Sequence, residues 1–387
     1  MVAVRCWCDT PAMPASTAAM PDHVRRLRDY YAGVAGATFY RAEFGYYCRE
    51  AWVAQGLPLD ADPAAEFGLD PRASFSLWGT GWCEPAFEPE FEVAVLEDRG
   101  EQEVVRDKAG RHVLYFKNRR DGFMPEYLAH AVHDRRSWEE DVRPRLDPAT
   151  PARWRDTAAT LAEARAAAAE GQLIVQRITG GYMYLRALIG PEDLPYTFYD
   201  DPGLIESCME AWLALADAVC ARHQQELVFD EIFFGEDICY NHGPLISPAM
   251  IERFLFPYYQ ELIDRVRRRQ ADGRRLYVHL DTDGFADPVI DLYRRAIGMD
   301  RISPCEVAAG TDVVALGERY PDLILSGGID KRILAAGRDA IETELQRILP
   351  VMRSRGGYYP TCDHGVPAEV PLADYRYYRQ RCLELGG

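Results

Sequence analysis

The sequence predicts an α/β protein, and more specifically a (β/α)8 TIM barrel with an N-terminal β-hairpin elaboration. From residue 173 onward, six short apolar runs are each followed by a helix-like segment, a succession typical of a parallel sheet with helical crossovers. No Gly-x-Gly-x-x-Gly turn follows a predicted strand, as would be usual in a doubly wound nucleotide-binding sheet. The 387 residues and the apolar fraction of 48% are enough to fill the core of such a barrel.

The N-terminal third is expected to contain a disordered start, a helix and a flap. We expect residues 1–20 to be poorly ordered and residues 21–387 to form a single barrel domain that begins with a helix near Pro21. Between about 74 and 117 the hydrophobic period becomes two, and turns containing Gly interrupt it. That pattern indicates β-hairpins, so an antiparallel flap attached to the barrel is predicted at 74–117.

The remaining two thirds alternate between strands and helices. Thr150-Pro151, Asp201-Pro202 and Ser247-Pro248 each combine a capping side chain with a proline, which is typical of a helix start. The apolar runs between the helices predict strands at 173–175, 227–229, 276–278, 301–302, 323–325 and 357–359.

Charge and cysteine usage restrict the classes of partner. With 44 Lys and Arg against 61 Asp and Glu, the net charge of −17 argues against binding to nucleic acid or to an anionic membrane. No stretch approaches the roughly 20 apolar residues that span a bilayer. The ten Cys show no repeated spacing, so a reducing cytoplasm is expected. The partner we expect is a small-molecule substrate, and a homodimer is the default assembly.

Polar residues follow the predicted strands and would meet at one rim, because the loops at the carboxyl ends of barrel strands form the active site. Carboxylates and imidazoles at this rim have the composition of a catalytic metal site. The expected ligands are Asp281, Asp283, Glu306 and His364, with His279 and Cys362 as second choices. Asp281 and Asp283 lie two residues apart, so both point to the same side of an extended segment. The same turns could instead be hydrogen-bonded caps without a metal.

Acid and base candidates lie beside this predicted site. Glu236 and Asp237 follow a predicted strand and are candidates for proton transfer, and the Cys362 thiol is a candidate nucleophile or ligand. Each of them has a structural alternative, namely a hydrogen-bonded loop for the two acids and an inert buried thiol for Cys362. Substrate contacts are expected from Arg41, Arg177, Tyr240, His242 and Asp330.

These segments resemble a known family. Residues 236–248, 281–284, 302–313, 327–331 and 360–367 look like the uroporphyrinogen decarboxylase superfamily, and most like a branch beside the corrinoid-linked methyltransferases. The resemblance covers roughly residues 22–385 and implies a (β/α)8 barrel. True uroporphyrinogen decarboxylases carry an Arg-rich N-terminal motif that this chain lacks, since Phe39-Tyr-Arg41 with Arg49 is a poor substitute.

In the methyltransferase branch, zinc is bound by His-x-Cys-Gly and by a later Cys. In register, Asp281-x-Asp283-Gly284 falls on the first motif and His364-Gly-Val-Pro367 on the second. The resemblance therefore implies a divalent metal, zinc in the first instance, held by harder ligands than thiolates. It also implies a corrinoid, or a corrinoid protein, as a candidate methyl donor.

Three functions follow from the sequence. The first is a metal-dependent methyl or small-group transferase, in which the ion acts as a Lewis acid. The second is a metal-free decarboxylase or lyase acting on a carboxylated substrate, tetrapyrrole-like or smaller, and it requires an Arg that reaches the site. The third is a binding protein without catalytic activity on the same barrel.

Overall fold

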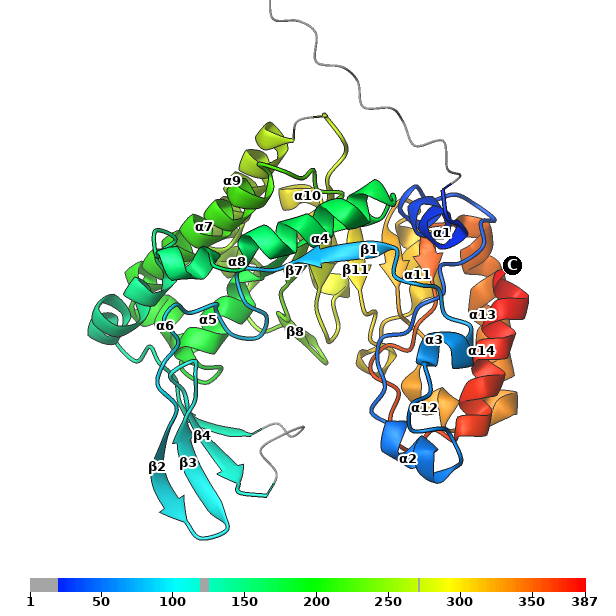
Figure 1. Cartoon of the computed structure of the whole chain (residues 1–387), viewed down its shortest axis with the longest axis horizontal. Helices are drawn as coiled ribbons and strands as arrows, with labels where there is room; N and C mark the ends of the chain where they lie inside the picture. The colour runs from blue at the N-terminus through cyan, green and yellow to red at the C-terminus, as the bar shows by residue number, and fades with distance from the viewer. Residues whose placement is uncertain (1–19, 119–124, 271) are drawn as a thin grey trace, which may run out of the picture.

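The computed structural model describes residues 20–118, 125–270 and 272–387. A curled sheet of seven parallel strands forms the centre, in the order β1-β6-β7-β10-β11-β12-β13 (Figure 1). Its strands are β1 (Ser74–Leu77), β6 (Leu173–Thr179), β7 (Glu231–Gly235), β10 (Tyr277–Asp281), β11 (Arg301–Ser303), β12 (Ile324–Ser326) and β13 (Tyr358–Tyr359). The curled parallel sheet confirms the TIM-barrel class.

Helices follow the strands and cover the outer face of the sheet (Figure 1). The larger ones are α4 (Thr157–Ala169), α5 (Gly181–Ile189), α7 (Pro202–His223), α9 (Phe256–Arg269), α10 (Asp287–Ile297), α13 (Arg338–Arg355) and α14 (Leu372–Gly386). The Asp201 side chain caps α7 and the Ser247 side chain caps α8 (Pro248–Phe254), as predicted from the two X-Pro steps. The smaller helical elements are α6 (Leu194–Asp200), α8 (Pro248–Phe254), α11 (Val313–Arg319), α12 (Lys331–Leu334), η1 (Ser137–Val142), η2 (Arg143–Leu146), η3 (Pro151–Trp154) and η4 (Val307–Ala309).

Alternation along the strands makes the outer layer apolar and the barrel interior polar. On β7, Phe234 packs on Tyr259 of α9, whereas its neighbour Phe233 packs on His279 of β10. Because side chains on a strand alternate between faces, Glu231 and Gly235 share the inward face with Phe233. The hydrophobic core therefore lies between sheet and helices, and charged side chains are left inside the barrel.

The N-terminal segment closes the barrel in two places. Helix α1 (Asp22–Tyr31) packs on the residues at the beginnings of the strands, in a cluster that includes Leu27, Tyr31, Leu173 and Ile324. After it, Tyr40 packs against Tyr359 of β13, with 5.6 Å between ring centroids, and its hydroxyl donates to Pro71 O just before β1. This segment therefore lies between the first and last strands of the sheet, while α2 (Arg49–Ala54) and α3 (Pro63–Phe67) follow it.

The antiparallel flap exists, with different limits from those predicted. It comprises β2 (Ala94–Arg99), β3 (Gln102–Arg106), β4 (His112–Phe116) and β5 (Glu126–Ala129), paired in that order. Residues 74–77, which we predicted as part of the flap, instead form β1 of the parallel sheet. Figure 1 shows the flap projecting on the same side as the hairpin of β8 (Cys239–Tyr240) and β9 (Gly243–Pro244), which follows β7, so the flap lies beside the carboxyl ends of the barrel strands.

One predicted strand is displaced along the chain. The strand expected at 227–229 is found at β7, Glu231–Gly235. The expected disorder of residues 1–20 lies outside the described residues, apart from Met20. None of the described helices is both long and apolar enough to cross a membrane.

Candidate active site

A row of four polar side chains runs through the barrel interior from β7 to the mouth; three of them are buried and the fourth, Asp281, is partly exposed. His279 Nδ1 lies 3.1 Å from Glu231 Oε1, and His279 Nε2 lies 2.8 Å from Ser303 Oγ. The Ser303 hydroxyl in turn donates to Asp281 Oδ2. Asp281 is the last residue of β10, so the row begins at the first residue of β7 and ends at the rim of the barrel. We call Glu231, His279, Ser303 and Asp281 the buried row.

Glu231, at the end of the buried row farthest from the barrel mouth, is held in its ionised state. Burial opposes the charge of Glu231, but His279, Arg301 and the hydroxyl of Tyr31 outweigh it and lower the pKa of Glu231 to about 2. Arg301 Nη1 lies 3.1 Å from Glu231 Oε2 and completes this ion pair inside the barrel. Burial lowers the pKa of His279 to about 4, and the charge of Arg301 acts in the same direction. The imidazole of His279 is therefore neutral near pH 7.

Asp281, at the end of the row nearest the barrel mouth, has a carboxyl group suited to proton transfer. Burial raises the pKa of Asp281 to about 6, against the opposing effects of the Ser303 hydrogen bond and the charge of Arg177. A carboxyl group whose pKa approaches the working pH can both donate and accept a proton during a reaction. Asp281 is thus an acid-base candidate placed at the rim of the barrel.

Arg177 lies beside this group without a carboxylate of its own. It shares the inward face of β6, in register with Phe233 of β7, and its guanidinium carbon lies 4.0 Å from the centroid of the Phe233 ring. Trp78 and Trp82, both partly exposed, border the same guanidinium at 4.9 and 5.6 Å. Its Nε donates a hydrogen bond to Ser76 Oγ at 3.3 Å, and within the described parts of the chain no carboxylate lies within 4.0 Å of the guanidinium. Such a cation is available to an anionic ligand.

The predicted metal ligands form hydrogen bonds and ion pairs with other groups of this chain. His364 Nε2 lies 3.2 Å from Asp283 Oδ1, and Glu306 accepts from Gly284 N at 2.9 Å and faces Lys331 at 3.9 Å. Asp281 belongs to the buried row. Among residues 20–118, 125–270 and 272–387, no group of three or more His, Cys, Asp or Glu is arranged to hold an ion. The residues as placed therefore do not fit the predicted metal centre, and metal dependence stays a prediction.

The structure brings together Asp283 and His364 but separates the three predicted catalytic residues. Glu236 is completely buried behind the sheet, where it accepts from the hydroxyls of Tyr259 and Tyr293. Asp237 pairs with Arg186 at 2.5 Å. The Cys362 thiol is fully buried, and burial raises its pKa, which disfavours the thiolate that a nucleophile needs.

The other predicted substrate contacts also differ in position. Tyr240 and His242 lie at the end of the hairpin formed by β8 (Cys239–Tyr240) and β9 (Gly243–Pro244), where both are exposed. Asp330 caps α12 and pairs with Arg332 at 2.8 Å, so its carboxylate is occupied. Arg41 is fixed through its backbone N–H, which donates to Asp70. Of the predicted substrate residues, Arg177 has the placement best suited to that role.

Several residues at the site were not expected from the sequence. Ser303 and Arg301 connect the buried row, and Trp78 and Trp82 come from the loop after β1. Asp237 and Cys305, both just after strands, are non-glycine residues with positive φ values of 45° and 58°. Unusual backbone conformations of this kind concentrate at functional sites.

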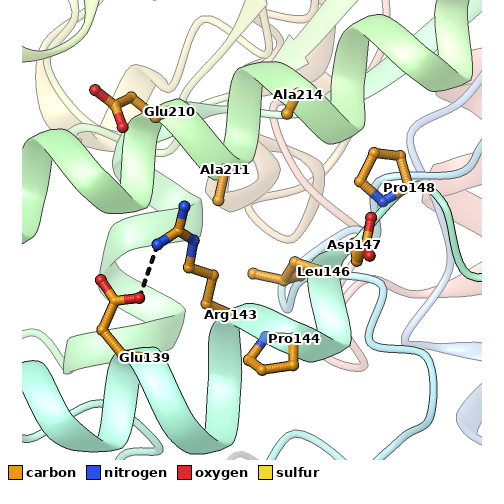
Figure 2. Close-up of a pocket in the computed structure, with 9 residues that line it drawn as sticks. All are labelled: Glu139, Arg143, Pro144, Leu146, Asp147, Pro148, Glu210, Ala211 and Ala214. Atoms are coloured by element: carbon orange, nitrogen blue, oxygen red, sulfur yellow. Dashed lines mark hydrogen bonds and ion pairs between the residues drawn. The ribbon is translucent and has the colours of Figure 1, made fainter.

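A separate groove lies on the outside of the barrel. It has a volume of about 620 Å³ and lies between residues 139–148 and α7 (Figure 2). On the wall formed by residues 139–148, Arg143 pairs with Glu139 at 2.7 Å. The lining of this groove contains none of the residues at the strand ends, so the size of the groove alone does not make it the active site. A second cavity, of about 400 Å³, is lined by Trp82 and the flap residues Lys108 and Ala109, and so adjoins the aromatic surroundings of Arg177.

Comparison with known proteins agrees with this architecture. Residues 158–384 match the family model described as uroporphyrinogen decarboxylase (URO-D), and this match covers more than half of the chain. The chain belongs to the uroporphyrinogen decarboxylase family. A uroporphyrinogen decarboxylase from Pseudomonas paraeruginosa is 30% identical over 134 residues, which cover 34% of this chain and 36% of the relative. One from Geobacter metallireducens is 26% identical over 129 residues, covering 33% of this chain and 35% of the relative.

These alignments span only about a third of the relatives' length, so membership does not transfer their activity. Among solved structures, a methyltransferase from Methanosarcina mazei is similar with a TM-score of 0.56 and 14% identity, covering 94% of this chain and 98% of that chain. At such low identity the likeness concerns the fold alone. The match to the family model agrees with the superfamily expected from the sequence, and the structural likeness agrees with the expected fold.

Proposed function

We propose that this member of the family is an enzyme that acts at the barrel mouth on a small carboxylated molecule, and that it is a carboxy-lyase. The observation that carries the proposal is Arg177, an inward-facing cation bordered by three aromatic rings and without a carboxylate partner among the described residues. An unpaired guanidinium in such a place favours a ligand carboxylate, which it can bind with two parallel hydrogen bonds.

The chemistry that we assign to the site follows from Asp281, the neighbour of Arg177. Arg177 would anchor a carboxylate of the substrate, while Asp281, one inward-facing position nearer the mouth on β10, would supply a proton. In decarboxylation the C–C bond breaks, CO2 leaves with its oxygens, and the electron pair left on carbon takes up one proton. An acid with a pKa of about 6 suits this last step near neutral pH.

A ligand panel tests the proposal directly. Full-length protein would be titrated with small mono- and dicarboxylates and with the matching amides, using calorimetry. We expect carboxylates to bind and amides to bind at least about ten-fold more weakly, because a charge-assisted contact contributes about 1.5–3 kcal/mol. Arg177→Met should abolish this preference. Arg186→Met is the matched control, since Arg186 already pairs with Asp237.

Turnover supplies the second half of the test. CO2 release would be measured for every ligand that binds, with wild type and with Asp281→Asn. We expect release by wild type and a loss of at least about 100-fold in the variant, the usual scale for removing a proton donor. Equal binding of acids and amides, or CO2 release unaffected by Asp281→Asn, would contradict the proposal.

Metal-dependent group transfer, the first function expected from the sequence, is left as a separate prediction. It is tested by metal analysis of protein purified without chelator, with Asp283→Ala and His364→Ala as variants. A stoichiometric ion that is lost in both variants would support it. The corrinoid methyl donor and the corrinoid protein partner are predictions of the same kind.

A further inference from the structure

Two exposed tryptophans meet at the barrel mouth. Trp78 and Trp82 are 44% and 42% exposed, whereas Trp138 and Trp212 are buried in the core. A single exposed apolar side chain is common on protein surfaces, but these two indoles contact each other, with 5.7 Å between ring centroids. Together they form a continuous aromatic surface that is open to solvent and borders the guanidinium of Arg177.

The loop that carries both indoles is fixed in place. Thr80, which lies between them in the sequence, is buried, and its hydroxyl accepts a hydrogen bond from Thr179 N at the end of β6 at 3.0 Å. Gly81 has a φ of +101°, and a Cβ atom at this position would clash with Glu84 O. Glycine therefore permits the tight turn that precedes Trp82. A surface held in this way loses little conformational freedom when a ligand binds.

The last residue of β7 leaves room for Trp82. The Trp82 ring stacks on Phe233, with 5.8 Å between the centroids and 26° between the planes. A Cβ atom at Gly235 would lie 2.8 Å from Cζ3 of Trp82, and φ at Gly235 is not positive. The absence of a side chain, rather than a special backbone conformation, is thus what Gly235 contributes. It lets the indole lie against the strand end while the residue stays partly exposed.

The two indoles form a corner that matches the shape of a flat ring. Their planes make an angle of 81°, so a ring that stacks on Trp82 meets Trp78 edge to face. Aromatic rings favour both arrangements. The guanidinium carbon of Arg177 lies 4.9 Å from the Trp78 centroid and 5.6 Å from the Trp82 centroid. A carboxylate bound to Arg177 is therefore close to both indoles, and a ring that bears this carboxylate directly reaches the corner.

We propose that the substrate carries its carboxylate on a single flat aromatic ring, and that Trp78 and Trp82 select this ring. The proposal rests on the proposed function, because Arg177 binds the carboxylate in both. It adds the class of substrate, an aryl carboxylate. The cavity of about 400 Å³ between Trp82 and the flap adjoins the corner and leaves space for substituents on the ring. A saturated ring of the same size is also apolar but cannot stack, so the indoles discriminate by stacking.

Three small ligands separate the contribution of the ring from that of the carboxylate. Benzoate and cyclohexanecarboxylate have rings of similar size and carboxylates that are ionised at neutral pH, whereas benzamide keeps the flat ring without the charge. Calorimetric titration of the full-length protein would measure the Kd of each. We expect benzoate to bind about three- to ten-fold more tightly than cyclohexanecarboxylate, the effect of one stacked aromatic pair. Benzoate should also bind more tightly than benzamide.

Substitution of the indoles tests their part in this selection. Trp78→Leu and Trp82→Leu each keep an apolar side chain and remove one flat surface. We expect each variant to reduce the preference for benzoate over cyclohexanecarboxylate to about two-fold or less, and to keep the preference for benzoate over benzamide. Trp154→Leu is the matched control, because Trp154 also borders an arginine, Arg222 of α7 at 5.4 Å, but belongs to the helix layer. It should leave both preferences unchanged.

A further variant moves an indole without removing it. Gly235→Ala places a methyl group where the Trp82 ring now lies, so it should displace the ring and lower the preference for benzoate over cyclohexanecarboxylate. If the indoles only supported Arg177 or the loop, the three variants would weaken the binding of both acids equally. Loss of stacking weakens the binding of benzoate alone.

The possible failures have different signatures. Equal binding of benzoate and cyclohexanecarboxylate to wild type, or equal weakening of both acids in Trp78→Leu and Trp82→Leu, would overturn this proposal and leave the carboxylate site at Arg177 intact. Equal binding of benzoate and benzamide would instead contradict the carboxylate site, and this inference with it.

Discussion

The hydroxyl of Tyr31, on the N-terminal helix α1, donates to Glu231 Oε2 at 2.6 Å and accepts from Arg301 Nη1 at 2.6 Å. A single phenol thus joins the helix that covers one end of the barrel to an ion pair inside it. Because Glu231 is the first member of the buried row, α1 supports the arrangement that ends at Asp281. A buried charge of this kind persists only if its hydrogen bonds are complete.

Tyr31→Phe should therefore destabilise the protein. The substitution keeps the ring and removes one donor from a buried carboxylate, which costs about 1.5–3 kcal/mol. Urea unfolding followed by circular dichroism would measure the change in the free energy of unfolding. Tyr47→Phe is the control, because the Tyr47 side chain is 74% exposed and should change stability by less than about 0.5 kcal/mol. Equal stability of the two variants would contradict this reading of Tyr31.

Glu236 should make stability depend on pH. Its carboxyl group is buried against Tyr259 and Tyr293, and burial raises its pKa to about 7. Since the folded pKa lies above the value near 4.5 of the unfolded chain, the folded state binds more protons between these values. The contribution is fully present below pH 4.5 and is lost as pH rises to about 7, amounting to about 3 kcal/mol.

The comparison of wild type with Glu236→Gln isolates this effect. As pH rises from 4.5 to 7.5, the free energy of unfolding of wild type should decrease relative to that of Glu236→Gln. Urea titrations at several pH values would measure it, with the exposed Glu163 as the site of a control Glu→Gln substitution. A pH-independent difference would mean that Glu236 is ionised throughout this range in the folded state.

Gly180 and Gly45 form a matched pair that tests the packing around the same carboxyl group. A Cβ atom at Gly180 would lie 2.0 Å from Glu236 Oε2 and 2.6 Å from Glu236 Cα, whereas one at Gly45 would meet nothing within 4 Å. Gly180→Ala should therefore cost about 3 kcal/mol or more, because the strand end after β7 must move, and Gly45→Ala should be close to neutral. Thermal unfolding of both variants would show whether the two substitutions differ.

The fold was predictable because its signals are local. Apolar runs and capped helix starts repeat at regular intervals, and the pairs Asp201-Pro202 and Ser247-Pro248 begin helices as expected. The displacement of one predicted strand affected the prediction of the site more than the prediction of the fold. The strand expected at 227–229 lies at 231–235, so Glu231, taken as a residue after the strand, is its first residue and faces the barrel interior.

The buried row was not predictable for a related reason. Its contacts join residues 231, 279, 281 and 303, which come from three strands, and their register is fixed by tertiary pairing rather than by local pattern. His279 and Asp281 were identified as metal ligand candidates because imidazole and carboxylate suit both metals and proton relays. Ser303 carries no comparable signal, since a serine before a proline is ordinarily read as a turn.

Asp283 and His364, the two predicted metal ligands that do meet, should be linked in their titration. The hydrogen bond from His364 to Asp283 is the main cause that raises the pKa of His364. A raised histidine pKa means that the pair stabilises the folded protein fully below pH 6.5 and that this contribution is lost as pH rises through the folded pKa.

Asp283→Asn should lower the pKa of His364, because the carboxylate that favours the imidazolium form is gone. Glu306→Gln is the control, since Glu306 acts on His364 only through a weaker charge effect. Histidine NMR with His364→Gln as the assignment variant measures both shifts, and an equal or larger shift in Glu306→Gln would show that Asp283 is not the principal partner.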